Sequence, residues 1–166
     1  MLDPKLEAAL NKQINMEFSA SYAYLAMAAH FDSINLQGFA RWMEQQSAEE
    51  QAHAKRLFTY LLDRGGRVGL EQIEKPTNDF ESVMDVFQHS LKQEQSNSQA
   101  INRLYALAKE LNDYATQSHL TWFLDEQVEE EKTMGEVIAK LQMIGDDKSA
   151  LLILDEQMAQ PRADGG

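Results

Sequence analysis

The sequence predicts an all-α protein, a bundle of four long helices with one long crossover and a short fifth helix near the C-terminus. The 166 residues include only 8 Gly and 3 Pro, which leaves long stretches without a helix breaker. Along four of these stretches, apolar residues recur every three or four positions, the spacing of an amphipathic helix. The length suits one domain, residues 1–160, and the polar tail 161–166 is expected to be disordered.

The first helix is expected to begin at Asp3-Pro4, because Asp caps free backbone N–H groups and Pro suits the first helical position. It should end near Ser33, and the second helix should span residues 36–63 before Gly65-Gly66 stops it. The expected apolar faces are Leu6, Leu10, Ile14, Phe18, Tyr22, Leu25 and Ala29 on the first helix and Phe39, Trp42, Met43, Gln46, Glu50, His53 and Leu57 on the second.

The third helix is expected to start after Asn78, which with Glu81 forms a capping pair, and to run to residue 111. The fourth should span residues 113–144, with Gly145 ending it. A fifth is expected over residues 149–158, where the run 150–154 is apolar nearly all round and predicts a subunit contact. The inward faces of the two long helices are Val83, Phe87, Leu91, Glu94, Ser98, Ile101 and Tyr105, then Leu120, Phe123, Gln127, Glu130, Met134, Val137 and Leu141.

The lengths of the links predict the topology. Short links join the first helix to the second and the third to the fourth, so each pair should be an antiparallel hairpin. The link over residues 65–78 can span about 46 Å when extended. A helix of roughly 30 residues is about 45 Å long. This link can therefore cross the whole bundle and leave the second and third helices parallel.

The composition limits the kinds of binding partner and of site that this chain can have. The net charge of −12 disfavours nucleic acid and anionic membrane and favours cations. There is no Cys, which excludes a disulfide, a thiolate metal site and a Cys nucleophile. The N-terminus lacks the apolar run of a signal peptide, and no segment reaches membrane-spanning length, so a cytoplasmic protein is expected.

Polar side chains interrupt the apolar face of all four long helices near their midpoints, and therefore at one depth in the bundle. Taken alone, each has a commoner explanation: a Glu-x-x-His pair arises by chance, an acidic run is usually solvated, and a core His is usually structural. Their coincidence on four helices is what indicates function. The residues are Glu17, Glu50, His53, Glu94, Gln127 and Glu130.

Burying this layer requires compensation, because an unpaired buried carboxylate costs several kcal/mol. No Lys or Arg lies on these faces at the same depth, and four carboxylates with a neutral His carry a formal charge of −4. Two divalent cations would neutralise it. Carboxylate and imidazole ligands suit Fe(II), Mn(II) or Zn(II), and bridging carboxylates permit a pair of ions.

This pattern resembles the ferritin-like di-metal proteins over residues 6–158, and the segment 47–54 is similar to the second-helix signature of ferritins. Gln127-x-x-Glu130 replaces a second Glu-x-x-His, as in bacterial-type non-haem ferritins and unlike bacterioferritins and rubrerythrins. Ala52 stands near the position where bacterioferritins use Met to bind haem, so no haem is expected.

The resemblance implies roles for individual residues. Glu17, Glu50 and His53 would hold one iron; Glu50, Glu94 and Glu130 would hold a second, with Gln127 orienting a bound water or oxygen species. Tyr24, two turns after Glu17, would be a hydrogen-bond donor and electron source, or simply a core aromatic. A third iron site is implied at Glu49, Glu126, Glu129 and Glu130, with a solvated acidic face as the alternative.

The resemblance also implies a function: a ferroxidase that oxidises Fe(II) with O₂ or H₂O₂ and stores ferric mineral in a homo-oligomeric shell of 24 subunits. The positions of the acids that line the threefold channel of animal ferritins are here Gln117 and Leu120, so the route of iron into the shell stays open. One alternative is a di-iron peroxide or oxygen reductase without storage, which would usually need a partner redox site such as Cys-bound iron. Another is a purely structural bundle, which leaves the buried acids unexplained.

Overall fold

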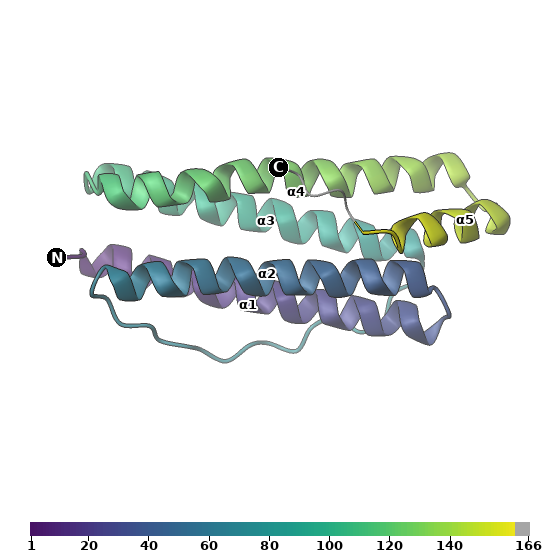
Figure 1. Cartoon of the computed structure of the whole chain (residues 1–166), viewed down its shortest axis with the longest axis horizontal. Helices are drawn as coiled ribbons and strands as arrows, with labels where there is room; N and C mark the ends of the chain where they lie inside the picture. Colours follow the sequence, from purple (N-terminus) through teal and green to yellow (C-terminus); the bar gives the residue numbers. More distant parts are fainter. Residues whose placement is uncertain (162–166) are drawn as a thin grey trace.

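The computed structural model describes residues 1–161 and confirms the all-α bundle. Its helices are α1 (Pro4–Ser33), α2 (Gln37–Asp63), α3 (Val83–Glu110), α4 (Tyr114–Ile144) and the short α5 (Lys148–Met158). In Figure 1, α1 and α2 lie side by side beneath α3 and α4, and α5 lies at the right-hand end of the bundle, between α4 and α2. Among these helices, none combines the length and the hydrophobicity needed to cross a membrane. Apart from Pro161, the predicted tail 161–166 lies outside the described residues.

Tight turns with a left-handed residue create the two hairpins. Asn35 (φ 63°) links α1 to α2, and Asn112 (φ 55°) links α3 to α4. Asn tolerates positive φ better than most residues, which suits it to ending a helix abruptly. Asp3 accepts a hydrogen bond from Lys5 N at 2.8 Å at the start of α1. Local chemistry thus sets where each antiparallel pair reverses.

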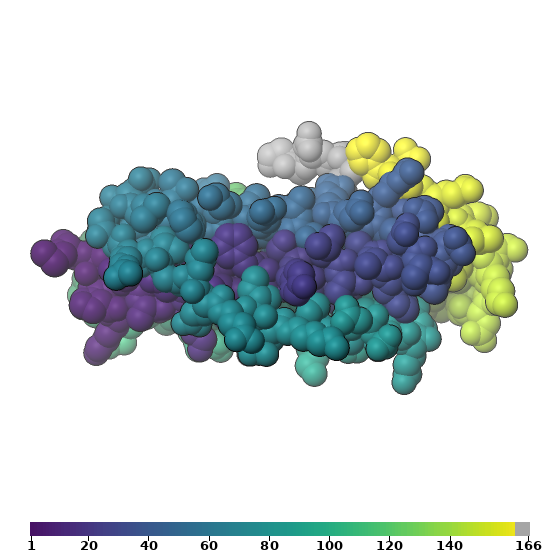
Figure 2. All heavy atoms as spheres, turned by 90° about the horizontal axis from the view of Figure 1, so that it is seen from below, coloured from purple at the N-terminus to yellow at the C-terminus, as the bar shows by residue number. Residues whose placement is uncertain are grey.

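The crossover, residues 64–82, runs the length of the bundle along α1, as Figures 1 and 2 show. Two side chains of α1 hold its backbone. Asn11 donates to Arg67 O (2.9 Å) and accepts from Gly69 N (2.7 Å). Asn15 donates to Gly69 O (3.0 Å) and accepts from Glu71 N (2.8 Å). Each side-chain amide therefore both donates to and accepts from the backbone of the crossover, as the backbone of a neighbouring β-strand would, and this fixes the crossover against α1.

Two details of the predicted helices are wrong. The third helix starts later than expected: Ser82, not Asn78, is its N-cap and accepts from Asp85 N at 3.0 Å. On α1, the predicted face drifts off the core, and Tyr22 and Leu25 are exposed. Repeated steps of four residues rotate about 40° beyond a full turn each. The observed core face corrects this drift with steps of three and comprises Leu6, Leu10, Ile14, Glu17, Ala20, Tyr24, Met27, Ala28 and Phe31.

The core is divided into two apolar clusters. One cluster contains Phe31, Phe39 and Phe87, whose rings stack and meet edge-on with centroids 5.2 to 6.1 Å apart. The other contains Leu10 and Leu120 among its fully buried residues. Along each of the four long helices, the six polar residues singled out in the sequence lie between the residues of one cluster and those of the other. They form a polar layer between two apolar halves.

The short helix α5 caps the start of α2. Leu36, the N-cap of α2, has no side-chain capping bond. Instead, Asp155 of α5 accepts from Phe39 N at 2.8 Å, which satisfies a free N–H and places a negative charge at the positive end of the helix. Gly38 allows this approach, because a Cβ there would lie 1.6 Å from Asp155 O. Leu152 and Ile153 on α5 are more than half exposed, which fits the predicted subunit contact.

A glycine pair tests this docking. Gly38→Ala should displace α5, lower the midpoint of thermal unfolding and speed proteolysis near the C-terminus. Gly135→Ala is the control, because nothing lies within 4 Å of its added Cβ and Ala favours a helix over Gly by about 1 kcal/mol. Calorimetry and limited proteolysis measure both. Equal behaviour of the two variants would contradict the steric account.

Candidate metal centre

Four helices contribute buried polar groups to one layer. Glu17 of α1, Glu50 of α2 and Glu94 of α3 are each at most 1% exposed. His53, Gln127 and Glu130 are at most 5% exposed. Each belongs to a helical face that is otherwise apolar, so burial of that face takes the polar group with it. The sequence therefore places all six in the core.

The best-formed group joins α1 and α2. Glu17, Glu50 and His53 each offer a ligand atom, and these atoms lie within 4.8 Å of one another. His53 Nδ1 is 3.6 Å from Glu50 Oε1 and 3.9 Å from Glu17 Oε2. The edge-to-face contact of the imidazole with Trp122, at 5.2 Å between ring centroids, restricts its orientation. This geometry can accept one cation among the three side chains.

A second group shares the same imidazole. His53, Glu126 and Glu130 also offer atoms within 4.8 Å of one another. Glu94 approaches from α3 and is held by two donors: Tyr24 donates its hydroxyl to Oε1, and Gln127 Nε2 donates to Oε2 at 3.2 Å. The two groups are therefore adjacent, as a pair of bridged ions would require.

The electrostatics of the layer favour cations. Burial is the main cause of the raised pKa of Glu17, and the negative charge of Glu50 raises it further. Burial is also the main cause of the raised pKa of Glu50, to which the charge of Glu94 adds. Burial also raises the pKa of Glu94, against the hydrogen bonds from Tyr24 and Gln127. Within residues 1–161, neither Glu50 carboxylate oxygen accepts a hydrogen bond from an amide, hydroxyl or backbone N–H group, and only the neighbouring Glu17 carboxyl can share a proton with it. Buried acceptors without donors are what a metal ion would satisfy.

The residues predicted for a third site are arranged unequally. Glu126 lies beside His53 and Glu130. Glu49 is half-buried and accepts from Gln46 Nε2 at 2.8 Å. Glu129 is 65% exposed, with Lys132 Nζ 4.0 Å away. The structure therefore brings Glu126 to the centre and leaves Glu129 on the surface.

Sequence reasoning missed two buried amides that contact the layer, Gln13 and Asn97. Gln13 Nε2 donates to Glu17 Oε1 at 2.8 Å, and Asn97 Nδ2 lies 3.3 Å from both Glu17 carboxylate oxygens. The available signal was spacing: Gln13 precedes Glu17 by four residues, and Asn97 follows Glu94 by three. Ser98 was instead assigned to the inward face of this helix, and it is only half-buried.

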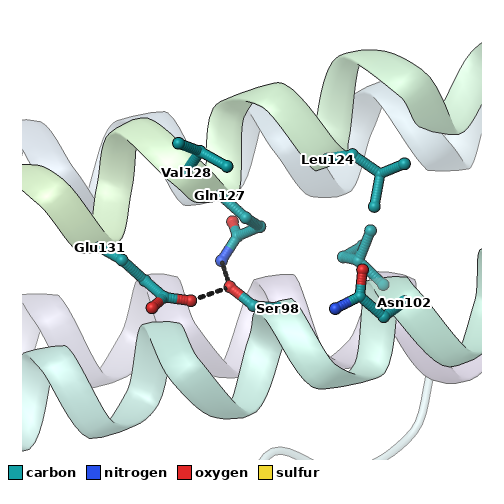
Figure 3. Close-up of a pocket in the computed structure, with 7 residues that line it drawn as sticks. Ser98, Asn102, Leu124, Gln127, Val128 and Glu131 are labelled. Atoms are coloured by element: carbon teal, nitrogen blue, oxygen red, sulfur yellow. Dashed lines mark hydrogen bonds between the residues drawn. The ribbon is translucent and has the colours of Figure 1, made fainter.

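A pocket of about 280 Å³ lies between α3 and α4 and is lined in part by Gln127 of this layer (Figure 3). Gln127 forms part of its lining and donates to Ser98 Oγ at 3.2 Å, and Ser98 donates to Glu131. Because Gln127 also contacts Glu94, a single side chain separates the pocket from a buried carboxylate. The full lining is Ser98, Ile101, Asn102, Leu124, Gln127, Val128 and Glu131.

The raised pKa of Glu50 predicts a pH-dependent stability of the metal-free protein. The folded state holds this proton more tightly than the unfolded state, whose carboxyl pKa is 4.5, so stability falls as pH rises above that value. Glu50→Gln should therefore raise the midpoint of thermal unfolding at pH 7, measured with chelator, by about 3 °C. The gain should shrink at pH 4.5.

Glu44→Gln, an exposed acid of the same helix, is the control and should show no such pH-dependent gain. A lower midpoint for Glu50→Gln at pH 7 would mean that the carboxylate stabilises the metal-free core.

Known proteins are similar to this chain in sequence and architecture. The family model described as a ferritin-like domain matches residues 7–144. A bacterial non-heme ferritin of Staphylococcus epidermidis is 43% identical over 159 residues, 96% of each chain, and one of Staphylococcus aureus is 41% identical over 158 residues, 95% of each chain. An open-pore ferritin of the archaeon Archaeoglobus fulgidus superposes with a TM-score of 0.96 at 40% identity, covering 98% of this chain and 100% of that one. The chain belongs to the ferritin family, and its relatives include bacterial non-haem ferritins.

Proposed function

We propose that this chain is the subunit of an iron-storage ferritin that oxidises Fe(II) to Fe(III) in its buried polar layer. The observation that carries the proposal is the buried layer itself: Glu17, Glu50 and His53 can hold one cation, and Glu94 and Glu130 lie close enough for their charges to raise the pKa of Glu50. Iron is the substrate and cargo here. Membership of the ferritin family supports storage as the outcome.

In this proposal, Glu17, Glu50 and His53 hold one Fe(II), and Glu50, Glu94 and Glu130 hold the other. Glu50 bridges them, which suits its two buried oxygens, because only the Glu17 carboxyl hydrogen-bonds to them in the metal-free layer. Gln127 orients water or the oxidant through the amide that now contacts Glu94. Tyr24, whose hydroxyl donates to Glu94, is positioned to steady that ligand or to supply an electron.

The chemistry needs no nucleophile. Two Fe(II) ions give up one electron each, and O₂ takes both with two protons to become H₂O₂; alternatively, H₂O₂ takes both with two protons to become two waters. Entry of the cations displaces the protons that burial and mutual repulsion hold on Glu17 and Glu50. The carboxylates neutralise charge and shift between terminal and bridging positions.

Storage requires an enclosed space, so the proposal includes a cytoplasmic homo-oligomeric shell of 24 such chains, without haem. The half-exposed Leu152 and Ile153 of α5 offer apolar surface for a subunit contact. The net charge of −12 supplies acids that draw Fe(II) toward the shell and its interior. Glu126 and Glu129 would pass Fe(III) from the centre toward that interior.

Aerobic addition of Fe(II), followed by size-exclusion chromatography, tests the proposal. Rapid oxidation with on the order of hundreds of irons co-eluting with a shell is expected, because the cavity and not the number of sites sets capacity. Glu17→Ala and His53→Ala should slow the fast oxidation at least 10-fold while the shell still assembles. Glu44→Ala is the exposed control on α2.

Two irons per chain on a small oligomer would instead favour a non-storage peroxide or oxygen reductase. Absence of tight iron binding would favour the remaining alternative, a purely structural bundle. Wild-type rates in both ligand variants would overturn the assigned centre even if the shell fills with iron.

The surface position of Glu129 predicts a late role. Glu129→Ala should leave the first fast oxidation within twofold of wild type and slow later turnovers, because the side chain is 65% exposed and lies outside the two ligand groups. Stopped-flow absorbance over repeated Fe(II) additions measures both phases. Glu136→Ala, an exposed acid two turns further along α4, is the matched control. If Glu129→Ala shows the same multi-turnover kinetics as wild type, Glu129 is only part of a solvated acidic face and has no role in iron transfer.

A further inference from the structure

Three buried amides form a directional chain across the polar layer. Gln13 Nε2 donates to Asn97 Oδ1 at 2.6 Å and to Glu17 Oε1 at 2.8 Å. Asn97 Nδ2 then lies 3.3 Å from Gln127 Oε1 and from both oxygens of Glu17. Gln127 Nε2 in turn donates to Glu94 Oε2 at 3.2 Å. The chain therefore runs from a carboxylate of α1 to a carboxylate of α3.

The chain allows only one orientation of Asn97. An amide offers two N–H donors and one carbonyl acceptor. Because Gln13 donates to Oδ1, the two N–H groups must serve Glu17 and Gln127. Turning the amide over would place its carbonyl oxygen against the Glu17 carboxylate and its N–H groups against the Gln13 donor. Asn97 is 4% exposed, so water cannot readily replace these partners.

The partners of Asn97 all lie in the polar layer. Within residues 1–161, its side chain bonds to Gln13, Glu17 and Gln127, and to no backbone group. It therefore caps no helix end and fixes no loop. A buried amide of this kind is replaceable by an apolar residue of equal shape unless its partners need it. Two of those partners are side chains of the proposed centre.

We infer that Asn97 is a positioning residue that orients Glu17 for metal binding and connects it through Gln127 to Glu94. The inference rests on the proposed function, since it assigns metal ions to both carboxylates. Ion binding at Glu94 changes the position of Gln127, and Asn97 passes that change to Glu17. Groups that hydrogen-bond to metal ligands typically set affinity by 10-fold or more.

Anaerobic titration with Co(II), a spectroscopic stand-in for Fe(II), tests the inference. The readouts are calorimetric binding and the d–d absorption of the bound ion. Asn97→Leu keeps the shape and removes the hydrogen bonds to all three partners. It should weaken the first Co(II) equivalent about 10-fold and alter its d–d band. Ser90→Ala is the control on the same helix: Ser90 is fully buried, but it bonds to Val86 O and Met27 Sδ, away from the layer.

Asn97→Leu with the affinity and spectrum of wild type would overturn the inference. So would an equal change in Ser90→Ala, because that would reflect helix packing. If Asn97→Leu does not assemble, Asn97→Ser is titrated against the same criteria. Failure of the wild-type protein to bind two Co(II) per chain would instead overturn the proposed function, so the two failures are distinguishable.

Discussion

The structure depends on one constraint, the burial of four carboxylates and an imidazole between two apolar clusters. Each cluster alone is an ordinary core, with Phe31, Phe39 and Phe87 on one side and leucines on the other. Between them, burial raises the pKa of Glu17, Glu50 and Glu94, so folding without cations holds protons on groups that would otherwise release them. Bound cations would remove this cost, and the proposed function places two Fe(II) ions there.

The surrounding fold keeps the layer in register. The antiparallel hairpins bring the midpoints of their helices to one depth. The crossover, held by Asn11 and Asn15, leaves α2 and α3 parallel. Asp155 of α5 secures the start of α2, the helix that carries both Glu50 and His53. Elements remote from the centre therefore determine how closely its ligands meet.

The buried faces of α2 and α4, with the site residues on them, were predictable from the sequence because they keep a regular helical period. Every residue predicted for these two faces is buried. The face predicted for α1 was wrong, because it used too many steps of four for a helix with 3.6 residues per turn, whereas the buried face includes steps of three. Asn97 was not predicted as a site residue for another reason. An Asn on a helix is usually solvated, and only the distances to Gln13, Glu17 and Gln127 reveal its partners. The unequal exposure of Glu126 and Glu129 likewise depends on tertiary packing.

The central claim is that this layer, and not the acidic surface, is where iron first binds. Anomalous diffraction at the iron edge from crystals soaked anaerobically in Fe(II) tests it most directly. Two peaks per chain are expected, one among Glu17, Glu50 and His53 and one beside Glu94 and Glu130. Iron found only at exposed acids such as Glu129, with the buried layer empty, would contradict the account.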